Sequence, residues 1–310
     1  SSWARHRKLK LQTFKVGPDY LDPQQLTAVS QRPCRNLDLI LCGSNWVKET
    51  FYKFSNVADL VLVEGVMGLF DGIGSSNKGS TAALADFLNL PIVLVVDAHG
   101  QAASLAALVK GFRDQQPQLQ LAGVVLNHVN TLRHKVLLTE VLENIEVKML
   151  GCIADNPELN LTTRHLGLAP AHEIKDLEKR IAQWAYIAER SLDLAAFRKI
   201  LQTPKNTNLS KKKIIITSQN KKLKVNPIAI AEDKAFHFRY PETKEYLEEI
   251  GIPCLTWKPI EDEPIPSEAK GLIIPGGFPE QYSEQLSSCK RTLKEVKKFF
   301  CHRPIYAECG

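Results

Sequence analysis

Acidic side chains follow apolar segments at several points in the first third of the chain. Glu64 comes directly after the apolar run 60–63, and Asp71 lies seven residues further on, in "VEGVMGLFDG". Lys15, Asp19 and Asp22 lie in "TFKVGPDYLDP", where an apolar segment runs into a Gly-Pro turn. An unpaired buried carboxylate is costly, so Glu64 in particular predicts a cationic or metal partner.

We expect these acids to meet at one sheet edge, because ligands bind at the carboxyl ends of strands in open parallel sheets. Mg²⁺ prefers carboxylate and water oxygens, so the acids predict a Mg²⁺ site for a polyphosphate. Two acids have a second interpretation: Asp22 precedes Pro23 and can be only a turn residue, and Asp97, after "PIVLVV", can be a helix N-cap. Asn127 ends "GVVLN" at a comparable position.

A cysteine near the other end of the chain has the setting of a nucleophile. In "PIYAECG", Cys309 follows a short apolar segment and precedes Gly310. A cysteine can act as a nucleophile when its thiol is exposed and forms the thiolate readily. The alternative is a core cysteine at the end of a strand.

The elements around these residues alternate between two patterns. Short runs that are apolar on both faces are separated by amphipathic helical stretches, which predicts an α/β fold with a parallel sheet covered by helices on both faces. The expected strands are "TFKV", "DLVLVEG", "PIVLVVDA", "LAGVVLNHV" and "KMLGCI", and the expected helices include "GSTAALADFL", "QAASLAALVKGFRDQ" and a long stretch over about 174–201. These elements form a first domain, residues 1–202.

The segment 203–226 separates this domain from a second one, residues 227–310. It holds seven lysines and no acid between positions 205 and 224, and without them the chain would carry 33 basic and 34 acidic side chains. The net charge of +6 is therefore local, and the Pro, Asn, Ser and Lys content predicts a solvated linker. No aromatic residues interleave with the lysines, so we expect no nucleic-acid partner. Beyond the linker, "PIAIAED", "YPETKEYLEEIG", "GLIIPGG", "CKRTLKEVKKFF" and "PIYAECG" predict a second α/β unit.

Composition excludes several other classes. No apolar run approaches the roughly 20 residues needed to span a bilayer, and "SSWARHRKLKLQTF" has no apolar core of the secretory kind. We therefore expect a cytoplasmic protein without a membrane partner. Seven cysteines, an odd number with no C-x-x-C pair, predict reduced thiols rather than disulfides or a zinc site.

The motifs, taken in order, carry a family resemblance over essentially the whole chain. They are "FKVGPDYLDP", "VLVEGVMGLFDG", "GSTAALADFLNLPIVLVVDA", "LAGVVLNHV", "RHLGL", "IAIAEDKAFHFRYPETKEYLEEIG", "LIIPGGFPEQY" and "PIYAECG". This series resembles the cobyrinic acid a,c-diamide synthases of cobalamin biosynthesis, which also act on hydrogenobyrinic acid. The pairing of "GPDYLDP" with "EGVMGLFDG" is the specific part, because the related cobyric acid synthases normally differ at both motifs.

The resemblance implies a first domain similar to dethiobiotin synthetase, with a P-loop NTPase-like fold, and an ATP- and glutamine-dependent ligase. ATP phosphorylates a substrate carboxylate, and ammonia from glutamine displaces the phosphate to leave an amide. It further implies that Asp19 and Glu64 bind Mg²⁺ and that Asp22 and Asp71 orient the metals or the substrate. Lys15 would offset phosphate charge and Asn127 would bond the adenine. A homodimer is a further expectation.

The second domain resembles a class I glutamine amidotransferase. This resemblance implies that Cys309 is the glutaminase nucleophile and that "PGGFPE", which contains Gly276 and Gly277, lies beside it. The backbone N–H groups of Gly277 and Gly310 would form the oxyanion hole for the thioester.

The ends of the chain depart from the family pattern. Residues 1–13 contain no glycine, whereas a G-x-x-x-x-G-K-[ST] loop should precede "FKVGPDY", and the His and acid that activate the cysteine normally follow it. We therefore expect an internal piece of a longer enzyme, inactive by itself, with an incomplete amidotransferase domain. Two alternatives stay open: a ligase for another tetrapyrrole such as nickel-sirohydrochlorin, and a non-catalytic relative.

Overall fold

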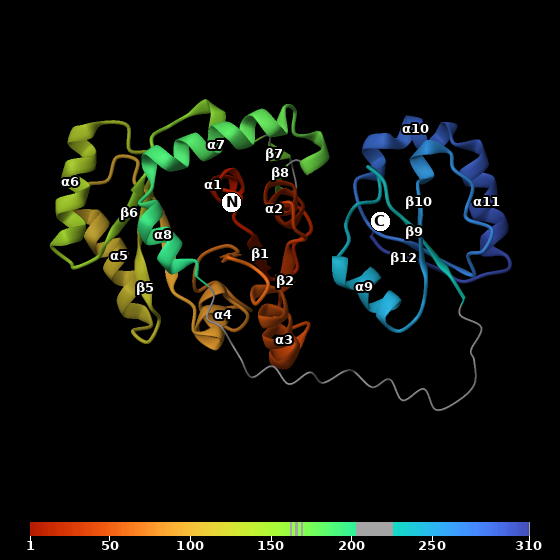
Figure 1. Ribbon diagram of the computed structural model, residues 1–310, viewed down its shortest axis with the longest axis horizontal. Helices are drawn as coiled ribbons and strands as arrows, with labels where there is room; N and C mark the ends of the chain where they lie inside the picture. The colour runs from red at the N-terminus through yellow and green to blue at the C-terminus, as the bar shows by residue number, and fades with distance from the viewer. Residues whose placement is uncertain (162, 165–166, 169, 203–225, 310) are drawn as a thin grey trace. The chain divides into compact units, whose positions relative to one another are not determined.

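The computed structural model describes residues 1–161, 163–164, 167–168, 170–202 and 226–309 (Figure 1). The chain divides into two compact units, Ser1–Leu209 and Ser210–Gly310, and each is described here by itself. The lysine-rich segment 203–226 lies outside the described residues except for Asn226.

The first unit alternates strands and helices. Its elements are α1 (Ser2–His6), β1 (Leu11–Val16), α2 (Asp22–Ser30), β2 (Arg35–Leu37), α3 (Gly43–Ser55), β3 (Leu60–Glu64), α4 (Thr81–Leu88), β4 (Ile92–Asp97), α5 (Ser104–Gln115), β5 (Leu121–Asn127), α6 (Leu132–Glu143), β6 (Met149–Cys152), η1 (Pro157–Leu159), β7 (Thr163–Arg164), β8 (Gly167–Leu168), η2 (Ala171–Glu173), α7 (Leu177–Ser191) and α8 (Leu194–Ile200).

Two parallel three-stranded sheets are the frame of this unit. Their strand orders are β2-β1-β3 and β4-β5-β6, and the short strands β7 and β8 pair antiparallel. The register places Lys15 of β1 opposite Asn36 of β2 and opposite Glu64 of β3. The predicted parallel α/β fold is confirmed. The side chains of Asn36, Lys15 and Glu64 form one polar row across the first sheet.

Helices cover both faces of the β2-β1-β3 sheet. Side chains alternate between the faces of a strand, so Phe14 and Val16 point to one face of β1, whereas Leu11 and Lys15 point to the other. The first pair packs with α3 and α4 in a core that includes Leu37, Val47, Phe51, Val61, Leu84 and Leu88. On the opposite face, Leu11 and Leu60 pack against Ala4 of α1. Every residue of β1 is consequently buried, including the polar residues Gln12, Thr13 and Lys15.

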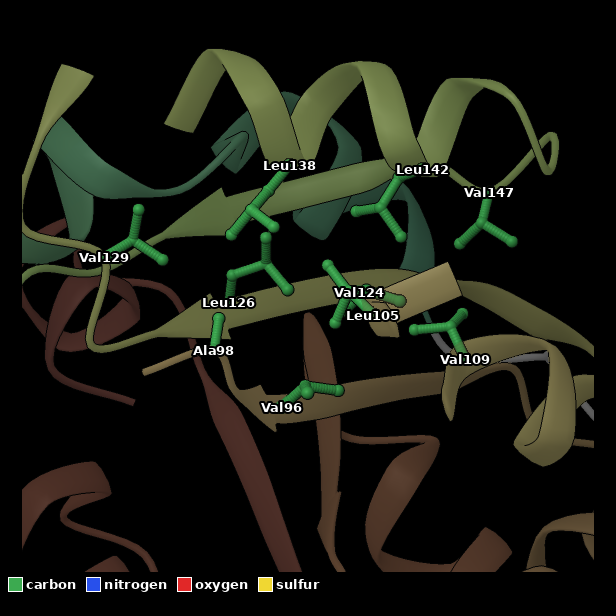
Figure 2. Packing of buried hydrophobic residues seen from close by; sticks show 10 residues of the cluster. All are labelled: Val96, Ala98, Leu105, Val109, Val124, Leu126, Val129, Leu138, Leu142 and Val147. Carbon is green, nitrogen blue, oxygen red and sulfur yellow. The ribbon is translucent and has the colours of Figure 1, made fainter. Parts of the chain in front are cut away.

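The β4-β5-β6 sheet has its own core. Figure 2 shows Leu138 and Leu142 of α6 pointing toward β5, where Val124 and Leu126 lie. Leu105 and Val109 of α5 belong to the same cluster, with Val96 of β4. These helices therefore anchor the strands that end at Asp97 and Asn127.

The helix expected over about 174–201 is interrupted. α7 ends at Ser191 and α8 begins at Leu194. Leu192 between them is extended and bridges to Gly151 in the edge strand β6. The Asp193 side chain accepts a hydrogen bond from the Ala196 N–H and caps α8. Pairing with the sheet therefore outweighs the continuation of the helix at this point.

The second unit contains one parallel four-stranded sheet of order β10-β9-β11-β12. Its elements are β9 (Ile228–Ala231), α9 (Pro241–Glu249), β10 (Cys254–Trp257), η3 (Pro259–Glu261), β11 (Gly271–Ile274), η4 (Pro279–Tyr282), α10 (Ser283–Ser288), α11 (Lys290–Phe300) and β12 (Ile305–Ala307). Trp257, Leu272 and Phe299 lie in its core. Among the described residues of both units, no helix has the length and apolar character needed to cross a membrane.

Candidate active sites in the two units

Lys15 is the centre of a charged cluster at the carboxyl edge of the β2-β1-β3 sheet. Its Nζ lies 2.6 Å from Asp22 Oδ2, 3.0 Å from Glu64 Oε1 and 3.7 Å from Asp19 Oδ2. It also donates a hydrogen bond of 2.9 Å to the Gly65 carbonyl. The expected convergence of acids at this edge is therefore present, and Glu64 has a cationic partner.

The cluster carries more negative than positive charge. One buried ammonium faces three carboxylates, and burial is the largest influence on each group whose pKa is shifted. Burial by itself lowers the pKa of Lys15, but the hydrogen bond to Asp22 and the charge of Glu64 outweigh it and raise that pKa. Burial raises the pKa of Glu64 despite Lys15, and burial with the Asp22 charge raises the pKa of Asp19. A further cation would relieve this imbalance.

The carboxylates have the donor chemistry for Mg²⁺. Within the described residues, no group of three or more His, Cys, Asp or Glu side chains could by itself hold a metal ion. Mg²⁺ is nevertheless commonly bound by one or two carboxylates, with waters and phosphate oxygens completing its coordination. Asp19 and Glu64 fit that arrangement, because both are partly exposed and belong to a cluster with three carboxylates and one ammonium.

Asp22 is more than a turn residue, because its carboxylate makes the shortest contact with Lys15 while it begins α2 ahead of Pro23. Asp71 lies elsewhere. It is exposed on the loop after β3, where it accepts a hydrogen bond from the Gly68 N–H. Among the described residues, no hydrogen bond or ion pair joins Asp71 to Lys15.

Asn127 and Asp97 lie side by side at the ends of β5 and β4, where they are paired in register. Asp97 does not cap a helix, because α5 begins only at Ser104 and the Asp97 carboxylate instead accepts the His99 N–H. That bond, with help from His128, lowers the pKa of Asp97. His128 Nδ1 lies 3.0 Å from Asp97 Oδ1, and its Nε2 lies 3.2 Å from Asn127 Nδ2. His128 is a polar residue of this edge that sequence reasoning missed.

Cys309 lies two residues beyond β12, and its backbone is left-handed, with φ of 71°. That conformation is uncommon for a residue with a side chain and recurs at functional turns. The thiol-bearing residue is exposed. Gly310 lies outside the described residues, so only one half of the expected oxyanion hole can be located.

The turn of Gly276 and Gly277 lies against this cysteine. A Cβ on Gly276 would come within 3.0 Å of the Cys309 Cβ, and a Cβ on Gly277 would clash with the Ala235 carbonyl oxygen. The Glu308 N–H donates to the Ile274 carbonyl, which ties the two segments together. The absence of side chains at this turn is therefore a requirement of the close approach.

Comparisons with known proteins show which family the chain resembles. A family model described as an AAA domain matches residues 27–163. A cobyrinate a,c-diamide synthase of Synechocystis is 38% identical over 100% of this chain and 64% of its own length. Those of Synechococcus and Methanobrevibacter smithii are 39% and 38% identical, over 98% and 99% of this chain and 67% and 68% of their own lengths. The chain thus spans about two thirds of the length of these curated relatives, and it belongs to the cobyrinate a,c-diamide synthase family.

Proposed function

We propose that this protein is an ATP- and glutamine-dependent ligase that amidates the a- and c-side-chain carboxylates of cobyrinic or hydrogenobyrinic acid. Membership of the family supports this function, and the observation that carries it is the Lys15 cluster with its excess of carboxylates. The relatives' names favour a corrin-type substrate over nickel-sirohydrochlorin.

In the proposed reaction, a substrate carboxylate oxygen attacks the γ-phosphorus of ATP and ADP leaves. Ammonia then attacks the carbonyl carbon of the acyl phosphate, and inorganic phosphate leaves with the bonding electron pair. A carboxylate is a poor electrophile and an acyl phosphate a good one, so activation is the step that the first unit must promote.

The residues of the first unit have separate tasks in this proposal. Lys15 offsets the charge of the transferred phosphoryl group, and Asp22 holds the Lys15 ammonium in place through their 2.6 Å contact. Asp19 and Glu64 would hold Mg²⁺, which supplies neutralisation of phosphate charge. Asp71 orients its loop, and through it the substrate, and Asn127 donates to the adenine.

Cys309 is the nucleophile that releases ammonia from glutamine. Its thiolate attacks the side-chain amide carbon, ammonia leaves, and water hydrolyses the thioester to glutamate. The N–H groups of Gly277 and Gly310 stabilise the oxyanion. The left-handed turn at Cys309 and the close approach of Gly276 support this role, because they bring the backbone of the glycine turn beside the nucleophile.

The remaining partners follow from the same proposal. The protein binds ATP, glutamine and a tetrapyrrole, forms a homodimer, acts in the cytoplasm and has no nucleic-acid or membrane partner. The local origin of its positive charge supports the last point.

Two variants of the intact protein test the proposed function, because they should differ in which nitrogen donor still supports amidation. Glu64→Gln should abolish amide formation with either glutamine or free ammonia as the nitrogen donor, because the phosphoryl-transfer site is lost. Cys309→Ser should abolish glutamine-dependent amidation and retain the ammonia-dependent reaction. Products are read by mass after incubation with ATP, Mg²⁺ and cobyrinic acid. Near-normal turnover and Mg²⁺ dependence in Glu64→Gln would contradict the proposal.

A further inference from the structure

Asn36 is a buried polar residue in the same row as Lys15 and Glu64. It is 7% exposed, lies in the middle of β2 and pairs with Lys15 in the parallel register. Its side-chain Nδ2 donates two hydrogen bonds of 2.8 Å, one to the Gly17 carbonyl and one to the Asp19 carbonyl. Both acceptors belong to the loop that leads from β1 to Asp22.

This loop carries two of the three carboxylates that face Lys15. Gly17 turns the chain with φ of 77°, and its N–H donates to the Leu37 carbonyl. Asp19 Oδ1 then accepts the N–H groups of Leu21 and Asp22, which shapes the start of α2. The position of the Asp19 backbone therefore governs where both acids lie.

An asparagine side chain meets the hydrogen-bonding needs of this position, and few other side chains could. Two backbone carbonyls need two donors from one short side chain, and an amide NH₂ provides both. The two carbonyl partners also determine which end of the amide faces the loop. The amide oxygen at the other end is energetically unfavourable: among the described residues, Asn36 Oδ1 is buried without a hydrogen-bond partner. An apolar residue would avoid that cost, so the two bonds to the loop are what the amide contributes.

We infer that Asn36 is a positioning residue: its amide holds the loop 17–22 so that Asp19 and Asp22 face Lys15 and Glu64. The consequence for metal binding rests on the proposed function. Without the amide, the Gly17 and Asp19 carbonyls lose their buried donor, the loop moves toward solvent, and the Asp19 carboxylate no longer lies beside Lys15. The affinity for a divalent ion should then fall, although no ligand has been removed.

The test compares Asn36→Leu with Gln12→Leu in the intact protein. Gln12 is the matched control, because it is 1% exposed in β1 and its amide also donates to two backbone carbonyls, those of Thr13 and Pro33. The Gln12 amide donates to neither the Gly17 nor the Asp19 carbonyl of the loop 17–22. Asn36→Ser, too short to reach both carbonyls, is a second variant in case the leucine prevents folding.

Two readouts are measured well below the melting temperature. Hydrogen exchange of the amides of residues 19–22 should accelerate at least tenfold in Asn36→Leu and remain within twofold in Gln12→Leu. The dissociation constant for Mn²⁺, followed by electron paramagnetic resonance with a non-hydrolysable ATP analogue, should rise at least tenfold in Asn36→Leu only. Asp19→Asn provides the reference for loss of a ligand.

The outcomes separate this inference from the proposed function. Unchanged exchange in both Asn36 variants would overturn the inference. So would a Mn²⁺ affinity that falls in Asp19→Asn but stays at the wild-type value in Asn36→Leu. If the wild-type protein bound no Mn²⁺, the proposed function would be contradicted, while accelerated exchange in Asn36→Leu alone would still support the hold of Asn36 on the loop.

Discussion

At the scale of single residues, the site is defined by one lysine among three carboxylates. Removing the ammonium and removing one carboxylate should change the stability of the protein in opposite directions. Without the ammonium, three acids are left in a poorly solvated place, whereas without one acid the remaining charges balance better. This asymmetry leads to two predictions.

Lys15→Met should destabilise the first unit by about 3 kcal/mol, the lower end of the roughly 3–5 kcal/mol that is usual for breaking a buried ion pair. The Lys15 side chain is 5% exposed, so water cannot replace it easily. Addition of Mg²⁺ should recover part of the loss, because the metal then supplies the missing positive charge. The measurement is chemical denaturation with and without Mg²⁺. A variant as stable as the wild type would show that the cluster needs no cation.

Asp19→Asn should stabilise the protein at neutral pH while weakening metal binding. The raised pKa of Asp19 means that the folded state holds its proton more tightly than the unfolded state does. Stability therefore falls as pH rises from the ordinary value through the raised pKa, and the amide removes that loss. An Asn keeps the oxygen that accepts from Leu21 and Asp22.

The melting temperature should rise by about 2–4 °C for each 1 kcal/mol gained at neutral pH. The difference should vanish well below the ordinary pKa of an aspartate, where both side chains are neutral. Thermal scans over pH measure this. A stabilisation that persists unchanged in acid would have a cause other than the charge.

At the scale of elements, α5 and α6 secure the β4-β5-β6 sheet through one apolar cluster (Figure 2). The apolar runs of the strands were recognisable in the sequence, and the strand predictions are confirmed at every site-bearing position. β2 was missed because it has only three residues, Arg35–Leu37, and no apolar run. It is a strand because β1 supplies its hydrogen-bond partners. That pairing also brings Asn36 beside Lys15.

Two neighbouring leucines of α6 provide a matched test of this packing. Leu138 is fully buried in the cluster, whereas Leu137 is 40% exposed. Leu138→Ala should cost about 2–5 kcal/mol in the free energy of unfolding, because it leaves a cavity. Leu137→Ala should cost a small fraction of that. Urea denaturation followed by circular dichroism measures both, and equal losses would mean that α6 does not pack as described.

At the scale of the whole molecule, the positive net charge comes from the seven lysines between positions 205 and 224, because the remaining basic and acidic side chains nearly balance. The chain divides into two compact units, and each carries one candidate site at the carboxyl ends of its parallel strands. The lysines at 205–224 are expected to be solvated and to take no part in either site.

Replacing Lys211, Lys212 and Lys213 with serine should therefore change stability by less than about 0.5 kcal/mol, as at ordinary surface positions. Amidation should be unaffected. Denaturation and a nucleic-acid binding assay at several salt concentrations check the two expectations. Salt-dependent binding of DNA or RNA that disappears with the substitution would reverse the interpretation of the segment.

The sequence by itself determined the residue types at the strand ends and the family to which they belong. Apolar runs on both faces are sufficient to predict parallel strands, and parallel strands are sufficient to bring Glu64, Asp19 and Asp22 to one edge. The cysteine after the last strand was recognisable in the same way. Each of these motifs is a short run of neighbouring residues, so it can be recognised without knowing which segments pair in the fold.

Only the tertiary structure decided which charge meets which. The sequence predicts that Lys15 offsets phosphate charge. In the fold its ammonium contacts Asp22, Glu64 and the Gly65 carbonyl, and the last two lie about 50 residues away in the chain. Asn36 and the left-handed turn at Cys309 likewise became apparent only in three dimensions. The reason is the strand register: a shift of one residue would turn Lys15 or Glu64 to the other face of the sheet, and no local pattern encodes the alignment of segments so far apart.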